Sequence, residues 1–339
     1  MQKKKTLRIA AVLFAAALAL TLAACGGNDK DSKLETKEIT FCLDWTPNTN
    51  HTGLYVAQAK GYFKDAGLTV KIVQPPENGT ASLVGGGKAQ FGIDAQDTMA
   101  DALVGKNKLP VTAVAAILQH NTSGIISLKK NGITSPKKMA GHSYATWDIA
   151  TEKATLKQVI QDDGGDFSKV KLIPSTVTDE PAALKSKSVD SIWVFYGWAG
   201  IACKQAGLDI NFWKFADINK VFDYYTPVII SNTDFLEKNP NTAKAFMKAI
   251  SKGYNYAAKN PEKAADILID QNSELKDSKK LVYASQKYLS KQYINGARQW
   301  GYIDPARWNR FYKWMNQHKL TKETLKTGIG FTDDYLPQK

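Results

Sequence analysis

Short apolar runs alternate with amphipathic segments along the chain from Glu38 onward. The apolar runs have the length of buried strands, and the segments between them predict helices that start at polar capping residues and stop at glycine. The expected strands are EITFCLDW, AGLTVKIVQPP, KAQFGID and PVTAVAAILQ, separated by helices in GLYVAQAKGYF, NGTASLVGGG and AQDTMADALVG. This order predicts a parallel or mixed sheet flanked by helices.

The alternation begins again after residue 120. The expected strands are SGIISLKK, GHSYATW, VKLIPST, SIWVFYG and DINFWKF, with helices in IATEKATLKQVIQDDGG, EPAALKSKS and AGIACKQAGL. The extended run DYYTPVIISN follows and is similar to the earlier run AVAAILQHNTSGIISL, and the chain is then helical almost to its end. The two extended runs predict two crossings between two sheets, near 120–126 and 224–229.

The predicted fold is therefore two α/β lobes joined by two crossover strands. The first lobe is expected to comprise 38–122 and to be completed, with C-terminal helices, by 226–339, and the second lobe comprises 123–225. In open α/β sheets, ligands sit beyond the carboxyl ends of the strands. Two facing lobes would bring those ends to one cleft.

The first residues predict export and a lipid anchor. A basic start, MQKKKTLR, precedes an apolar stretch that ends in LAAC, the pattern of a bacterial lipoprotein signal. The expected signal peptide is 1–24, Cys25 is the expected lipid acceptor, and 25–37 reads as a flexible tether. The alternatives are a transmembrane anchor, or a secreted protein in which this cysteine is coincidental. The favoured reading is a soluble domain on the outer face of the cell membrane.

Charge changes this picture little. Lysine and arginine exceed aspartate and glutamate by 13, but they are spread along the chain without a dense basic run. A nucleic-acid partner is therefore not expected.

Cysteine and histidine give no metal site. Apart from Cys25, the chain has Cys42 in an apolar strand and Cys203 in a small-residue helix, and both read as buried thiols. The four histidines are scattered without a ligand-like spacing. The patterns GxSxG and GxGxxG and the P-loop are also missing, so no enzyme class is indicated.

Aromatic and polar residues gather where the predicted strands end. The candidates are Asp44, Trp45, Asn48 and His51, then Gln96 and Asp97, Trp147 and Asp148, Asp179 and Glu180, Tyr196 and Trp198, and Tyr224 and Tyr225. Rings can stack on the faces of a flat ligand, while amides and carboxylates bind its edge donors and acceptors. Together they favour a small, planar, nitrogen-rich ligand.

Each candidate also has a structural alternative. Trp45 and Trp147 could be core aromatics, and His51 could be a polar residue in the first turn of a helix. Asp179 or Glu180 could cap the following helix, and Asp44 could bond backbone amides of its own turn.

Four segments carry a family resemblance: DWTPNTNHTGLYVAQAKGYFKDAGLTVKI, VDSIWVFYGWAGI, FYKWMNQHKL and GIGFTDDYL. They resemble the bacterial periplasmic pyrimidine-binding proteins related to yeast hydroxymethylpyrimidine synthase, from about residue 38 to the end. Within that family the chain is most similar to formylaminopyrimidine-binding lipoproteins of thiamine-salvage importers. The resemblance implies a type II periplasmic-binding-protein fold. It also implies a monomer that holds a pyrimidine without cofactor or catalysis, with an ABC permease and its ATPase as partners.

The resemblance also implies site residues. Trp45, Asn48 and His51 become first-lobe candidates, and Tyr196 and Trp198 become second-lobe candidates. One departure stands out: the residue after YGW is Ala199, where family members commonly carry an acid.

Two other functions stay open. One is an enzyme of pyrimidine synthesis on the same fold, although the related eukaryotic enzymes carry a cysteine-rich iron-binding motif that this chain lacks. The other is a binding protein for another flat heteroaromatic such as riboflavin.

Overall fold

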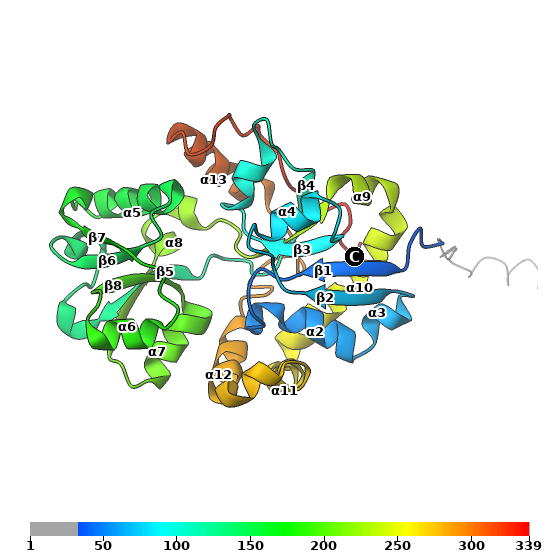
Figure 1. The fold of residues 1–339 in the computed structure, drawn as a ribbon, viewed down its shortest axis with the longest axis horizontal. Helices are drawn as coiled ribbons and strands as arrows, with labels where there is room; N and C mark the ends of the chain where they lie inside the picture. Colours follow the sequence, from blue (N-terminus) through cyan, green and yellow to red (C-terminus); the bar gives the residue numbers. More distant parts are fainter. Residues whose placement is uncertain (1–32, 339) are drawn as a thin grey trace, which may run out of the picture. The chain divides into compact units, whose positions relative to one another are not determined.

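Two five-stranded sheets organise the part of the chain that the computed structural model describes, residues 33–338. The predicted signal peptide, Cys25 and most of the predicted tether lie outside these residues. The first sheet has the order β2 (Thr69–Val73), β1 (Glu38–Cys42), β3 (Phe91–Asp94), β10 (Val228–Asn232) and β4 (Val111–Ala116) (Figure 1). The second has the order β7 (Lys171–Pro174), β6 (Ser143–Thr146), β8 (Ser191–Phe195), β5 (Ser123–Leu128) and β9 (Ile210–Lys214).

The two sheets share one topology. In each, three strands run parallel, and the first strand after a crossing between the sheets inserts antiparallel beside them: β10 in the first sheet and β5 in the second. The predicted mixed sheets and two-lobed α/β arrangement are thus present in the structure.

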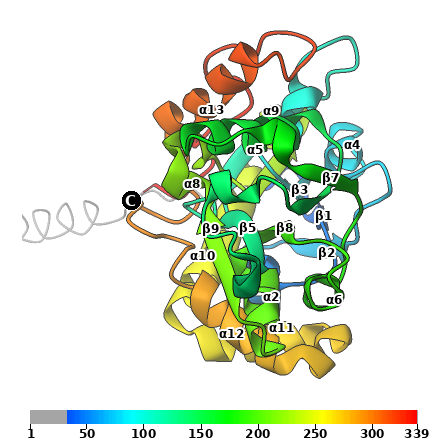
Figure 2. The ribbon, with the colours of Figure 1, turned by 90° about the vertical axis from the view of Figure 1, so that its left-hand side faces the viewer.

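Helices cover the sheets. The first sheet is accompanied by α2 (Thr52–Ala59), α3 (Tyr62–Asp65), α4 (Thr80–Gly85), α9 (Thr233–Lys238) and α10 (Pro240–Lys259), followed along the chain by α11 (Pro261–Gln271), α12 (Lys279–Leu289) and α13 (Pro305–Gln317). The second carries α5 (Ala150–Asp162) and α8 (Phe215–Ile218) on one face, and α6 (Glu180–Ser186) and α7 (Ile201–Gln205) on the other (Figures 1 and 2). None of the helices in the described residues is long and apolar enough to cross a membrane.

Side-chain alternation explains how the second sheet is covered on both faces. In β8, Ile192 and Val194 pack into the cluster that contains Leu184 of α6, whereas Trp193 packs into the cluster that contains Leu156 of α5. This is the two-residue period of a strand buried on both sides. The same alternation places Trp193 on the opposite face of the sheet from Ile192 and Val194.

The chain crosses between the sheets twice, after Ala116 and before Val228. These connections are irregular segments that lie side by side. They are not paired strands, because most of the hydrogen bonds between them involve side chains rather than two backbone groups. Asn121 donates from its backbone N–H to Asp223 Oδ1 at 3.1 Å and from its amide to Phe222 O at 2.9 Å. The Ile117 N–H donates to Pro227 O at 3.0 Å.

Two glycines set the closest helix packing in the first lobe. A Cβ on Gly253 of α10 would lie 2.0 Å from the backbone oxygen of Gly53 in α2. Next to this contact, the Tyr254 hydroxyl donates to Asn50 O at 2.7 Å. The α2–α10 contact therefore holds the turn that precedes α2, where several candidate residues lie.

We expect Gly253→Ala to destabilise the protein by about 1–3 kcal/mol, because the added methyl forces α2 and α10 apart in a close-packed core. Urea unfolding monitored by circular dichroism measures this. The matched control is Lys248→Ala, an exposed position of the same helix, which should change stability by less than about 0.5 kcal/mol. Equal effects at both positions would contradict the packing argument.

Candidate functional site

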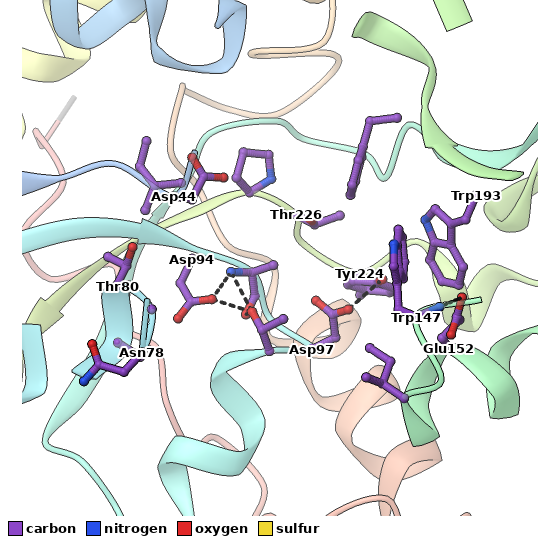
Figure 3. Close-up of a pocket in the computed structure, with 18 residues that line it drawn as sticks. Asp44, Asn78, Thr80, Asp94, Asp97, Trp147, Glu152, Trp193, Tyr224 and Thr226 are labelled. Carbon is purple, nitrogen blue, oxygen red and sulfur yellow. Dashed lines mark hydrogen bonds between the residues drawn. The ribbon is translucent and has the colours of Figure 1, made fainter. Parts of the chain in front are cut away.

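A cavity of about 520 Å³ lies among the carboxyl ends of strands from both sheets. Its eighteen lining residues are Asp44, Asn78, Gly79, Thr80, Ala81, Ile93, Asp94, Ala95, Asp97, Thr98, Trp147, Ile149, Glu152, Trp193, Phe195, Tyr224, Thr226 and Pro227 (Figure 3). They lie in or after β1, β2, β3, β6 and β8, or belong to the second connection. This is the position that the strand order predicts for a ligand.

Asp44 is held by a buried histidine. His51 is fully buried, and its Nε2 lies 2.7 Å from Asp44 Oδ1. Its Nδ1 accepts the backbone N–H of Asn48 at 3.3 Å, so Nε2 carries the ring proton and donates to the carboxylate. The second oxygen of Asp44 makes no hydrogen bond to a described residue. Asp44 is thus a fixed carboxylate with one oxygen left to accept from a ligand.

A second carboxylate, Asp94, ends β3. Its Oδ1 accepts the Ala95 N–H at 2.8 Å and the Thr98 hydroxyl, while Oδ2 has no hydrogen bond to a described residue. Burial, together with the neighbouring charges of Asp97 and Asp44, raises the pKa of Asp94 to about 6, against the opposing effect of these hydrogen bonds.

Asp97 and Tyr224, which both line the cavity, are joined by a hydrogen bond. The Tyr224 hydroxyl donates to Asp97 Oδ2 at 3.2 Å. Burial raises the pKa of both side chains, and the Asp97 charge further raises that of Tyr224. The pair links the strand end after β3 to the second connection, so it joins parts of the chain that lie far apart in sequence.

The fourth carboxylate, Glu152, has both oxygens hydrogen-bonded within the protein. It accepts from the Tyr144 hydroxyl at 2.6 Å, the Thr146 hydroxyl at 2.8 Å and the Trp147 N–H at 3.1 Å. These bonds fix the backbone at the end of β6. Glu152 therefore positions Trp147, whose side chain is 42% exposed and lies 5.7 Å from Trp193 between ring centroids.

Of the candidates named from the sequence, Asp44, Asp97, Trp147 and Tyr224 line this cavity. Trp45 neighbours Asp44 but is 61% exposed and lies outside the lining. Asn48 accepts the Asn50 N–H at 2.9 Å and, with His51, forms the cap of a short 3₁₀ helix, η1 (Thr49–His51). The resemblance placed Asn48 and His51 against a ligand; here they sit behind Asp44.

Gln96 and Tyr225 bond within the first lobe. The Gln96 amide donates to Trp308 O at 2.8 Å and accepts the Tyr225 N–H at 3.0 Å. Tyr225 is buried, and its hydroxyl accepts the Asp304 N–H at 2.8 Å. Neither side chain lines the cavity.

The second-lobe candidates Glu180, Tyr196 and Trp198 also lie away from the cavity lining. Glu180 begins α6 behind Asp179, which caps that helix by accepting the Ala182 N–H at 2.9 Å. Tyr196 and Trp198 belong to one turn of π-helix, η6 (Tyr196–Gly200), which turns their rings toward Tyr288 and toward a buried cluster around Leu268.

Ala199, in the same turn, is buried in the cluster behind β8. An acid at 199 would lie in that cluster rather than in the cavity. In this chain the carboxylates come instead from Asp44, Asp94 and Asp97 of the first lobe.

Sequence reasoning missed Asp94, Trp193 and Phe195. Asp94 is the last residue of its strand, two positions before the residues that were considered, and the same strand-end rule could have found it. Trp193 lies inside the apolar run SIWVF and carries no local signal. Within the described residues, no three His, Cys, Asp or Glu side chains are grouped so that they could hold a metal ion.

The chain matches the family model described as NMT1/THI5 like over residues 48–264. The chain belongs to the NMT1/THI5-like family. Among its relatives is the formylaminopyrimidine-binding protein of Halalkalibacterium halodurans, 27% identical over 97% of this chain and 98% of that protein. Another is the 4-amino-5-hydroxymethyl-2-methylpyrimidine phosphate synthase THI13 of Saccharomyces cerevisiae, 28% identical over 79% of this chain and 81% of the enzyme.

This NMT1/THI5-like chain also resembles solved structures. The alkanesulfonate-binding protein SsuA from Xanthomonas axonopodis pv. citri matches with a TM-score of 0.64, over 88% of this chain and 99% of that one, at 9% identity. At that identity the likeness concerns the fold alone. It confirms the two-lobed solute-binding-protein fold expected from the sequence.

The raised pKa of Asp94 predicts a pH-dependent stability. A carboxyl whose pKa is about 6 in the folded chain and about 3.9 in the unfolded chain favours folding most at low pH, and this contribution is lost as pH rises through 6. We expect Asp94→Asn to stabilise the protein at pH 8 by about 1–3 kcal/mol, with little effect at pH 4.

Urea unfolding at pH 4, 6 and 8 tests this expectation. Asp65→Asn, at an exposed position of α3, is the control and should show no such trend. A stability difference for Asp94→Asn that is the same at all three pH values would contradict a buried, destabilised carboxylate.

Proposed function

We propose that this chain is the extracytoplasmic solute-binding protein of an ABC importer, and that it binds a thiamine-precursor aminopyrimidine. The observation that carries the proposal is the cavity, which joins free carboxylate oxygens to aromatic rings at the strand ends of both sheets. Support comes from the relative named formylaminopyrimidine-binding protein, which matches over nearly the full length of both chains. Of the two precursors, we propose the formylaminopyrimidine as the preferred ligand over the hydroxymethylpyrimidine.

The cavity chemistry suits an aminopyrimidine. An exocyclic amino group is a donor, and Asp44 and Asp94 each present an acceptor oxygen without a partner among the described residues. The flat ring has the faces that Trp147 can stack on. None of the described residues lining the cavity is Lys or Arg, so an anionic ligand would meet carboxylates without compensating charge.

Binding by closure of the two lobes follows from this arrangement. Asp44 and Asp94, the carboxylates with an unbonded oxygen, belong to the first lobe, and Trp147 and Trp193 belong to the second. A ligand that contacts both lobes stabilises the closed state over the open state. The size of this effect is set by how much more tightly the ligand binds the closed state. The permease and its ATPase would then receive the loaded, closed form.

The alternative is an enzyme of pyrimidine synthesis, which the yeast relatives favour. The described lining residues include no Lys, Cys or His, the side chains that most often form covalent intermediates or transfer protons. The two cysteines Cys42 and Cys203 are buried, and burial raises the pKa of both thiols, that of Cys203 to about 12. Binding without chemistry is the function that these residues support.

Isothermal titration with formylaminopyrimidine, hydroxymethylpyrimidine, thiamine and riboflavin tests the ligand. We expect both pyrimidines to bind one monomeric chain. Trp147→Ala should weaken binding tenfold or more, because it removes about 1 kcal/mol of stacking and about 25 cal/mol per Å² of apolar burial.

Ile173→Ala, at an exposed apolar position in β7 outside the cavity lining, is the matched control and should leave the affinity unchanged. Heat from riboflavin or thiamine alone would sink the pyrimidine assignment. A changed pyrimidine mass after incubation would instead favour the enzyme.

The lipid anchor is a separate proposal that rests on LAAC. Cys25→Ser removes the acceptor thiol, so the variant should take up no labelled palmitate while the parent chain does. Cys203→Ser, which leaves the signal intact, is the control and should be labelled normally. A parent chain that is released soluble and unlabelled would overturn the anchor.

A further inference from the structure

One wall of the cavity contains a polar group that none of the described residues satisfies. Trp193 is only 6% exposed and lines the cavity, yet its indole N–H has no hydrogen-bond partner among the described residues. Buried donors in folded proteins are almost always paired. An unpaired donor in the wall of a binding cavity therefore points to a ligand acceptor.

The indole is held firmly in place. It packs against Phe215 with ring centroids 4.1 Å apart and against Trp147 at 5.7 Å. Its strand, β8, is paired with β5 along its whole length, so the backbone cannot turn the ring elsewhere. In Figure 3 the nitrogen-bearing edge of Trp193 faces the side on which Trp147 lies, across the cavity from Asp44 and Asp94.

The other polar groups give the cavity two chemically different ends. Asp44 and Asp94 offer acceptor oxygens from the first lobe. Glu152, the acid nearest to Trp193 in Figure 3, already accepts three hydrogen bonds from the protein. The second-lobe end is thus left with an unpaired donor, and both oxygens of its carboxylate are already bonded within the protein.

We propose that Trp193 Nε1–H is a specificity determinant that binds a carbonyl oxygen of the ligand, at the end opposite the amino group held by the first-lobe carboxylates. The inference rests on the proposed function and deepens it, since a formyl group supplies such a carbonyl and a plain methyl group does not. Because Nε1 is covered in this structure, the proposed contact requires the partly exposed Trp147 ring beside it to rotate aside.

The energetic advantage lies in the state of the donor before binding. An indole N–H that is already shielded from water gives up no bond to water when a ligand accepts from it. The hydrogen bond therefore contributes more than one that replaces a hydrated donor. A ligand with the same ring but no acceptor leaves the N–H as it was, so discrimination follows directly.

The test replaces Trp193 by 3-benzothienylalanine, which keeps the size and shape of the indole but has sulfur in place of N–H. Formylaminopyrimidine and 4-amino-2,5-dimethylpyrimidine, which lacks the carbonyl, are titrated into the parent chain and the variant. We expect about tenfold weaker binding of the formyl compound, corresponding to about 1.4 kcal/mol, and unchanged binding of the dimethyl compound.

Trp213 provides a matched control. It lies in β9 of the same sheet, is 9% exposed, and also has an indole N–H without a partner among the described residues, but it does not line the cavity. The same replacement at 213 should leave both affinities unchanged. Equal losses at 193 and 213 would show a structural effect and overturn the proposal.

A spectroscopic readout separates the hydrogen bond from packing. The Trp193 indole proton in a ¹⁵N-labelled chain should move downfield with the formyl compound and stay in place with the dimethyl compound. If the parent chain binds both pyrimidines but the isostere weakens both equally or neither, the Trp193 proposal fails and the proposed function stands. If the parent chain binds neither pyrimidine, both fail.

Discussion

The Asp223 carboxylate ties together the two connections on which the site depends. Its Oδ1 accepts the Asn121 N–H from the first connection, its Oδ2 lies 2.8 Å from His120 Nδ1, and Arg307 of α13 approaches to 3.8 Å. Burial would raise the pKa of Asp223, but His120, Arg307 and the Asn121 N–H together lower it. One charged group thus fixes the two crossings to each other and to the first lobe. Because the crossings are fixed, the strand ends of both sheets open on one cavity.

Within that cavity the carboxylates differ in the number of hydrogen bonds that they accept from the protein. Glu152 is fully bonded and fixes backbone, whereas Asp44 and Asp94 each keep an oxygen free because one oxygen alone is held. The contrast arises from local sequence. Glu152 lies in the first turn of α5 and accepts hydrogen bonds from the preceding strand, β6, whereas Asp44 and Asp94 lie at or just beyond strand ends. An excess of 13 basic residues in the whole chain therefore coexists with a cavity whose ionisable lining is acidic.

The fold followed from the sequence because strand and helix periods are local properties. The first connection, 117–122, overlaps the predicted crossing at 120–126, and the second ends just before Val228, within the predicted 224–229. Trp147 lies at the strand end where it was expected. The rest of the site depends on which way a turn folds. Tyr196 and Trp198 looked like cavity residues because they follow β8, but one turn of π-helix directs them away. His51 looked like a ligand contact, but burial places it behind Asp44. Trp193 could not be predicted as a site residue, because the neighbours of a strand residue are known only once the pairing of the sheet is known.

The uneven exposure of the tryptophans gives the protein a built-in optical property. Trp45 and Trp147, 61% and 42% exposed, are the tryptophans among the exposed large apolar residues of the described chain, and both lie at or beside the cavity. An indole in water fluoresces at longer wavelength than one in a packed interior. The red-shifted part of the intrinsic emission therefore originates next to the site. Any binding that shields these two indoles from water therefore shifts the intrinsic emission to shorter wavelength. This shift can be measured without attaching a label.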